Sequence, residues 1–385
     1  MLHIQQRHSL PRRIKRRGTR SQPIINPVQA ARAAGLRYCT DASQGISRQR
    51  HGRGFTYHWP DGATVRDRPT RARIKSLAVP PAWTAVWICP DARGHLQATG
   101  RDAKGRKQYR YHPLWRAFRD DTKFGRMVAF GEALPGLRAH LARDIERGGF
   151  TREHVLATVL RLLDTTCIRV GNEEYARDNH SFGLTTLRTR HVRVRGSIIR
   201  FAFRGKSGQR HDVTIHDRRL ARIVARCQDL PGHLLFEYLE SDGQVHGISS
   251  DDVNARLREL TGSDFTAKDF RTWSGTVLAA RALCDLGAAD SATQAKHNIA
   301  AAIGVAARHL GNTPAICRRS YVHPGIIAAY EEGIVVGGAA SHDEASAPLH
   351  PPTTELSDDE RAVLQMLRHP RVHPQARAGG QARAG

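Results

Sequence analysis

The sequence predicts an α+β fold, in which a small β-rich N-terminal domain precedes a larger, mainly α-helical domain with a β-hairpin insert. Three observations predict it. Short strand-like runs separated by turn dipeptides fill residues 36–113. Apolar residues at helical spacing dominate residues 114–335. One alternating stretch, residues 191–216, interrupts the helices, and the 385 residues suffice for two domains with tails.

The composition says more about the partners of the chain than about its fold. Lysine and arginine total 60 against 36 acidic residues, which gives a formal net charge of +24. A surplus of this size favours polyanionic partners. No apolar run approaches the roughly 18 residues of a membrane span, and no apolar stretch follows the basic N-terminus as in a secretory signal. The six cysteines are scattered without a CxxC pair, which is typical of reduced thiols in a cytoplasmic protein and not of a zinc site.

The N-terminal third divides into an arm and a domain. Residues 1–35 are predicted to be a basic disordered arm, and its cluster PRRIKRRGTR at 11–20 is expected to bind phosphates. Residues 36–113 contain the strand-like runs FTYHW and VWICP, with Pro-Asp, Asp-Gly and Lys-Gly as turns. We therefore expect a small β-rich domain here.

Capping signals mark the helices of the second domain. Thr151 precedes an apolar stripe, and Thr266 with Asp269 three residues later forms a capping pair. Thr313-Pro314 opens the helix that leads to Tyr321. Residues 336–385 are rich in Ala, Ser, Pro and Gly and are predicted to be a flexible tail, with a short helix near 356–367.

Four side chains of this domain supply the groups needed to cut a phosphodiester without a metal. Tyr321 provides a phenolic nucleophile whose ester is easily reversed. Arg169 and Arg271 provide planar, permanently charged donors for phosphate oxygens, and Arg271 lies in the first helical turn together with Lys268. Lys206, in the hairpin turn GKSG, provides an acid for the departing oxygen.

Each of these residues also has an ordinary structural explanation. Arg169 has helical spacing to Glu173 and Glu174 for a surface ion pair. Lysine is common and inert in hairpin turns, and an isolated tyrosine such as Tyr321 is usually a core aromatic. A nucleotide-binding loop ending in GKS is excluded, because the first glycine that it requires is replaced by Arg200.

The order and context of the motifs decide between these explanations. RVGNEEYA, GKSGQRHDV, KDFRTW and LGNTPAICRRSYVHP follow one another, and KGRKQYRYHP lies in the first domain. Together they resemble the type IB DNA topoisomerases, specifically the poxvirus-like enzymes of bacteria, over about residues 36–332. The resemblance implies the fold that these enzymes share with tyrosine recombinases. It also implies that the protein relaxes supercoiled duplex DNA through a 3′-phosphotyrosyl intermediate, without ATP, metal or other cofactor.

The resemblance also implies roles for individual residues. Tyr321 would be the nucleophile, Arg169 and Arg271 would bind the non-bridging oxygens, and Lys206 would protonate the 5′-hydroxyl. Asn312 stands where the poxvirus enzymes have histidine; it can donate a neutral hydrogen bond, so we expect a modest effect on rate. The residues implied in DNA contact are Gln108, Tyr109, Tyr111, Gly171, Tyr175 and Lys268.

Two other functions stay open from the sequence. A tyrosine recombinase has a similar catalytic set, but it typically carries His-x-x-Arg where this chain reads Lys268-Asp269-Phe270-Arg271. A non-enzymatic DNA-packaging protein would explain the charge but not the ordered motifs. The resemblance further implies a monomer that acts on the nucleoid and has no membrane partner.

Overall fold

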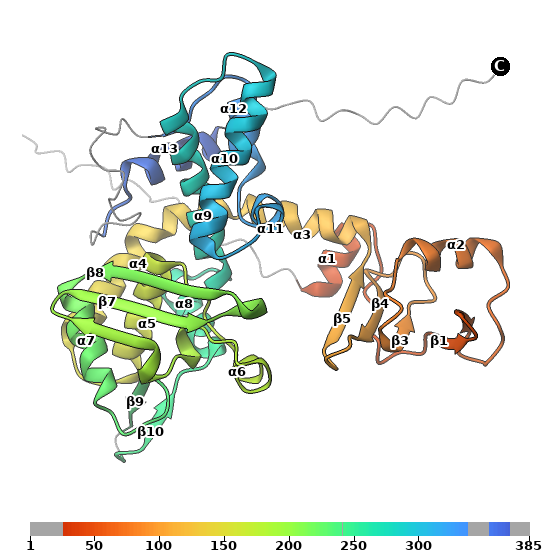
Figure 1. Cartoon of the computed structure of the whole chain (residues 1–385), viewed down its shortest axis with the longest axis horizontal. Coiled ribbons are helices and arrows are strands. Elements are labelled where there is room, and N and C mark those ends of the chain that lie inside the picture. The colour runs from red at the N-terminus through yellow and green to blue at the C-terminus, as the bar shows by residue number, and fades with distance from the viewer. Residues whose placement is uncertain (1–25, 241, 338–353, 370–385) are drawn as a thin grey trace, which may run out of the picture.

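The computed structural model describes residues 26–240, 242–337 and 354–369. It consists of an N-terminal sheet domain and a larger helical region on opposite sides of helix α3, Pro113–Gly125 (Figure 1). Within the described ranges, every helix is too short or too polar to cross a bilayer. The predicted division into a β-rich and a mainly helical part is confirmed.

The N-terminal domain is a five-stranded antiparallel sheet in the order β2-β1-β3-β4-β5. Its core contains Ile46, Ile88 and Ala98, which are fully buried, and helix α2 covers them with Ile74. The turns lie at the predicted dipeptides, and Gly62 and Gly105 adopt positive φ angles at two of them. The elements are α2 (Arg68–Ser76), β1 (Ile46–His51), β2 (Gly54–His58), β3 (Thr84–Ile88), β4 (Leu96–Arg101) and β5 (Lys107–Tyr111).

The predicted disordered arm, residues 1–35, is wrong at its C-terminal end. Pro27–Ala33 form helix α1, whose N-cap Asn26 accepts a hydrogen bond from Val28. Ala30 and Ala31 are buried in a cluster with Trp115 of α3, so small apolar residues fix this segment to the connecting helix. The basic cluster at 11–20 lies outside the described residues.

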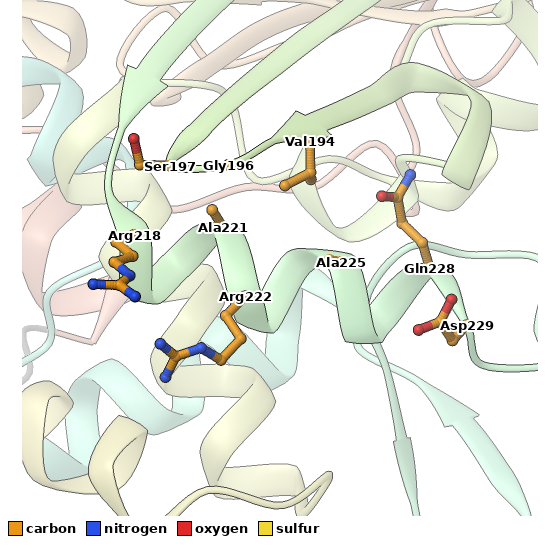
Figure 2. Close-up of a pocket in the computed structure, with 9 residues that line it drawn as sticks. All are labelled: Val194, Gly196, Ser197, Arg218, Ala221, Arg222, Ala225, Gln228 and Asp229. Carbon is orange, nitrogen blue, oxygen red and sulfur yellow. The ribbon is translucent and has the colours of Figure 1, made fainter.

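The helical region is built around α5, which is buried on nearly all sides, and α9. The alternating stretch forms the antiparallel strands β7 and β8. Ile198 pairs with His216 at one end and Arg204 pairs with Arg210 at the other, and β6 adds a third strand beside β7. The β6–β7 turn and α7 border a surface groove of about 760 Å³, where Arg218 and Arg222 extend from the helix (Figure 2). The elements up to α8 are α4 (Met127–Arg147), α5 (Arg152–Thr166), α6 (Glu173–Asn179), β6 (Val192–Arg195), β7 (Ile198–Arg204), β8 (Arg210–His216), α7 (Arg218–Gln228), β9 (Glu237–Leu239), β10 (Val245–Gly247) and α8 (Ser250–Thr261). Those that follow are α9 (Ala267–Leu286), α10 (Ala292–Leu310), α11 (Pro314–Ser320) and α12 (Pro324–Glu331).

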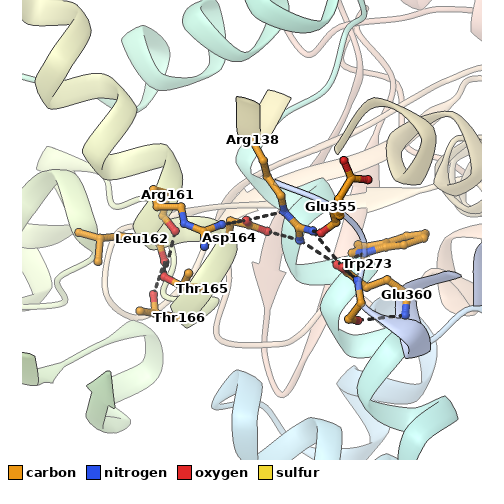
Figure 3. Close-up of polar contacts among 10 residues, drawn as sticks. Arg138, Arg161, Leu162, Asp164, Thr165, Thr166, Trp273, Glu355 and Glu360 are labelled. Atoms are coloured by element: carbon orange, nitrogen blue, oxygen red, sulfur yellow. Dashed lines mark hydrogen bonds and ion pairs between the residues drawn. The ribbon is translucent and has the colours of Figure 1, made fainter. Parts of the chain in front are cut away.

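The predicted flexible tail also needs correction. Residues 358–368 form α13, Asp358–Arg368, near the predicted short helix, but α13 packs against α4 and α9 as part of the core. Glu360 is fully buried there and accepts hydrogen bonds from Arg138 of α4 and from the indole of Trp273 of α9 (Figure 3). Arg138 also donates two hydrogen bonds, of 2.9 and 3.0 Å, to the carboxylate of Asp164 of α5. One buried ionic network therefore joins four helices.

Candidate active site

Arg271 is the buried centre around which the predicted site residues gather. It is the fifth residue of α9, at the start of the second turn and not in the predicted first turn; the helix begins with the predicted capping box between Thr266 and Asp269. Its side chain is directed inward, and the residue is 3% exposed. The guanidinium donates one hydrogen bond to the carbonyl of Cys167 and another, of 2.7 Å, to the carbonyl of Leu310. Arg271 thus joins the C-terminal ends of α5 and α10.

Arg169 and Asn312 follow those two helix ends and meet each other. Cys167 ends α5 in the left-handed conformation, and Gly311 ends α10 in the same way. Two residues after Cys167, Arg169 donates a 2.5 Å hydrogen bond from Nη2 to Oδ1 of Asn312. Burial, reinforced by the neighbouring charge of Arg271, lowers the pKa of Arg169 to about 10. Two guanidinium groups that repel each other in a partly buried site are expected to bind an anion strongly.

Tyr321 lies beside both arginines, at the end of α11. Its ring centroid is 5.1 Å from the guanidinium carbon of Arg271, and its hydroxyl contributes a hydrogen bond and a charge that oppose the lowering of the Arg169 pKa. The backbone of Tyr321 packs directly on Gly275 of α9, where an added Cβ would lie 2.7 Å from the Tyr321 carbonyl oxygen. A glycine at this position allows the segment of Tyr321 to approach the helix that carries Arg271. The side chain is only partly buried.

Three buried donors around this cluster have no hydrogen-bond partner. They are Nη1 of Arg169, Nε of Arg271 and Nδ2 of Asn312. An unpaired buried donor costs about 1–3 kcal/mol, so three in one place need an explanation. A phosphate with its oxygens turned toward the three donors would satisfy them all.

Lys206 is not part of this cluster. It is exposed in the short 3₁₀ turn Lys206–Gly208 between β7 and β8, and its ammonium makes no hydrogen bond or ion pair with any described residue. The turn end of the same hairpin nevertheless borders the site, because His211, which pairs with Phe203 beside the turn, packs against both Gly205 and Gly311. Lys206 directly follows Gly205, so it lies on the turn that borders the cluster, with its side chain exposed.

The predicted DNA-contact residues divide between the two domains. Tyr109 and Tyr111 of β5 stack at 5.9 Å, and Tyr109 is 46% exposed. Gln108 instead donates to Asp102 in the neighbouring turn. Arg106, in the β4–β5 turn, is within electrostatic range of Tyr175 on α6, so the tip of this hairpin approaches the helical region.

The other two candidates lie on the catalytic side. Lys268 is exposed on the first turn of α9. Gly171 has a φ angle of +110°, and an added Cβ would lie 2.8 Å from Oγ1 of Thr185. Gly171 therefore has a structural role, because the loop after Arg169 leaves no room for a side chain at this position. None of the predicted site residues lines the groove beside α7.

Sequence reasoning missed two residues at this site. His211 stacks on Phe203 with ring centroids 5.0 Å apart, and burial together with Arg169 and Arg271 lowers its pKa to about 4. Lys123 of α3 donates to the carbonyl of Ser320, directly before Tyr321. His211 was present in the motif GKSGQRHDV and could have been found there; Lys123 had no local signal.

Comparison with known proteins places this geometry in a family context. Residues 112–336 match the model of the eukaryotic DNA topoisomerase I catalytic core, and residues 54–102 match that of the bacterial DNA topoisomerase IB N-terminal domain. The chain is similar to the DNA topoisomerase 1B of Acanthamoeba polyphaga mimivirus, with 33% identity over 295 residues that cover 75% of this chain and 88% of the relative. It is also similar to the DNA topoisomerase 1B of vaccinia virus (strain Copenhagen), with 22% identity over 268 residues, 68% of this chain and 82% of the relative.

Proposed function

This chain belongs to the type IB DNA topoisomerases, and from that membership we propose how its own residues cut and reseal duplex DNA. Tyr321 attacks the scissile phosphorus through its phenolic oxygen. The bond from phosphorus to the 5′-oxygen breaks, and a 3′-phosphotyrosyl ester forms. The 5′-hydroxyl attacks in the reverse direction to reseal the strand. One phosphate ester replaces another of similar energy, so the exchange needs no ATP.

The observation that carries this proposal is the set of three unpaired buried donors beside Tyr321. The transition state places extra negative charge on the non-bridging oxygens, and preorganised donors in a low-dielectric site stabilise that charge most strongly. Arg169 and Arg271 supply charge and direction, and Asn312 supplies a neutral donor. Removing one such donor typically lowers a rate by about 10²–10³.

Lys206 is proposed as the acid that protonates the 5′-oxygen. Its place on the turn supports this role, because the preceding Gly205 packs on His211 beside Gly311, and a loop that closes when substrate binds completes such a site. A duplex with sulfur in place of the bridging 5′-oxygen tests the role, because a thiolate leaves without protonation. Lys206→Ala should be slow on the oxygen substrate and near the wild-type rate on the sulfur substrate.

The two domains are proposed to close around the duplex as a clamp. Tyr109 and Tyr111 on β5, and Tyr175 and Lys268 on the helical region, supply aromatic and cationic groups to opposite sides. The approach of Arg106 to Tyr175 supports closure at this point. A monomer acting on the nucleoid is part of the same proposal.

Plasmid relaxation in EDTA without ATP tests the proposed function. Wild-type protein should relax supercoiled plasmid and leave a covalent adduct when denaturant is added during the reaction. Tyr321→Phe should bind duplex and do neither. Tyr238→Phe, at a half-buried tyrosine on β9, is the matched control and should act like the wild type. Relaxation by Tyr321→Phe at the control rate would exclude Tyr321 as the nucleophile.

A further inference from the structure

The connecting helix α3 ends directly on the segment that carries the proposed nucleophile. Lys123, in its last turn, donates from Nζ to the carbonyl of Ser320. The next residue, Phe124, packs edge to face on His323, with ring centroids 5.2 Å apart. The end of α3 therefore contacts the chain on both sides of Tyr321.

The ammonium of Lys123 also lies beside the ring of Tyr321. Nζ is 5.6 Å from the centroid of that ring and 4.3 Å from the centroid of Phe124. A cation at this distance from an aromatic ring is attracted to it, and it stabilises a phenolate more than a phenol. The sequence analysis gave Lys123 no role, and the three unpaired donors do not include it.

The same helix end is anchored on the helix that carries Arg271. Arg126, the C-cap of α3, donates to the carbonyl of Asp264 and lies 3.6 Å from the carboxylate of Asp269. Asp269 is two residues before Arg271. The last turn of α3 thus fixes the nucleophile segment relative to the start of α9.

We propose that Lys123 is a positioning residue for Tyr321: it fixes the carbonyl before the nucleophile and holds a positive charge beside the phenol. This inference rests on the proposed function of Tyr321. Because α3 follows β5 directly, separated only by His112, the same contact connects the strand of Tyr109 and Tyr111 to the nucleophile. Seating of DNA on β5 can therefore be transmitted along a single helix to the site of cleavage.

The charge of Lys123 gives the inference a distinctive pH dependence. Burial lowers the pKa of Lys123 to about 8, although the carboxylates of Asp120 and Asp269 act in the opposite direction. The other groups that face it are the phenol of Tyr321 and the imidazole of His323. Burial first, and then the charge of Lys123, lower the pKa of His323 to about 4, so that this ring is neutral over the range of interest. Above pH 8, Lys123 loses the charge that a substituted arginine would keep.

The test compares Lys123→Met and Lys123→Arg with wild type and with Arg116→Met. Arg116 is exposed on the same helix, so this control also removes one positive charge. The rate of covalent adduct formation on plasmid, with enzyme in excess, is measured from pH 6 to 10, together with the duplex Kd and the Tm. Lys123→Met should form adduct about 10–100-fold more slowly than Arg116→Met, with equal Kd. The rate of Lys123→Arg relative to wild type should rise as the pH passes 8.

Three results would overturn the inference. One is an adduct rate for Lys123→Met equal to that of Arg116→Met. Another is a ratio of Lys123→Arg to wild type that stays flat with pH, because a packing role would not respond to the charge. The last is a wild type that forms no adduct at all, which would overturn the proposed function as well. A wild type that forms adduct beside unaffected variants would refute only the role of Lys123.

Discussion

Replacing Glu360 by glutamine should destabilise the whole helical region, although position 360 lies beyond the part of the chain that matches the family model. The buried carboxylate accepts hydrogen bonds of 2.9 and 2.8 Å from Arg138, 3.0 Å from the Trp273 indole and 2.9 Å from the Ser357 amide. A glutamine amide removes the charge and turns an NH₂ group toward one of these donors. Removing one partner of a buried ion pair costs about 3–5 kcal/mol. Because Arg138 keeps Asp164, we expect the lower end, about 3 kcal/mol.

Thermal unfolding provides the assay for Glu360→Gln. At about 2–4 °C per kcal/mol for a region of this size, Tm should fall by roughly 6–12 °C. Asp358→Asn removes the same charge from the same helix, but it breaks only an exposed pair with Arg361, worth about 0–1 kcal/mol. A Tm for Glu360→Gln within about 2 °C of that control would refute the reasoning. A carboxylate whose removal changes the free energy of unfolding so little does not hold four helices together.

The remaining predictions concern the site and the clamp. The lowered pKa of His211 means that, between about pH 6.5 and 4, the unfolded chain binds a proton that the folded chain does not; stability should therefore fall as the pH drops through this window. His211→Asn should reduce the loss of Tm between pH 6.5 and 4.5 relative to wild type, whereas the exposed His140→Asn should not. Asn312→Ala, which leaves Nη2 of Arg169 without its partner, should slow adduct formation about 10²–10³-fold, with an unchanged shape of the pH profile. If the clamp contacts about six to ten phosphates, affinity for duplex should fall about 10³–10⁵-fold between 50 and 200 mM salt, and a flat response would exclude clamp binding through phosphates.

The sequence predicted those parts of the molecule that depend on neighbouring residues. The capping box of Thr266 and Asp269, the proline start of α11 and the β7–β8 hairpin are local, so their signals lie within a few residues. Lys123 and Ser320 are 197 residues apart, and Arg138 and Glu360 are 222 apart. The sequence around Lys123, in an amphipathic helix, and around Glu360, in a polar segment, contains no pattern that identifies a partner so far along the chain. The prediction therefore failed where a charge is buried by long-range packing.

The same distinction explains why helix ends dominate the site. Arg169 and Asn312 each lie just past the C-terminal end of a helix, Arg271 lies near the start of another, and Tyr321 ends α11. Helix C-terminal ends leave carbonyls without partners, and Arg271 satisfies two of them, at Cys167 and Leu310. Both terminal nitrogens of the guanidinium are thus occupied by the protein, while the buried Nε makes no hydrogen bond with a described residue. A lysine could supply the charge but could not join two helix ends and still present a fixed donor. Arg271 therefore connects the fold to the proposed chemistry, because the hydrogen bonds that join the helix ends also hold the guanidinium in one place.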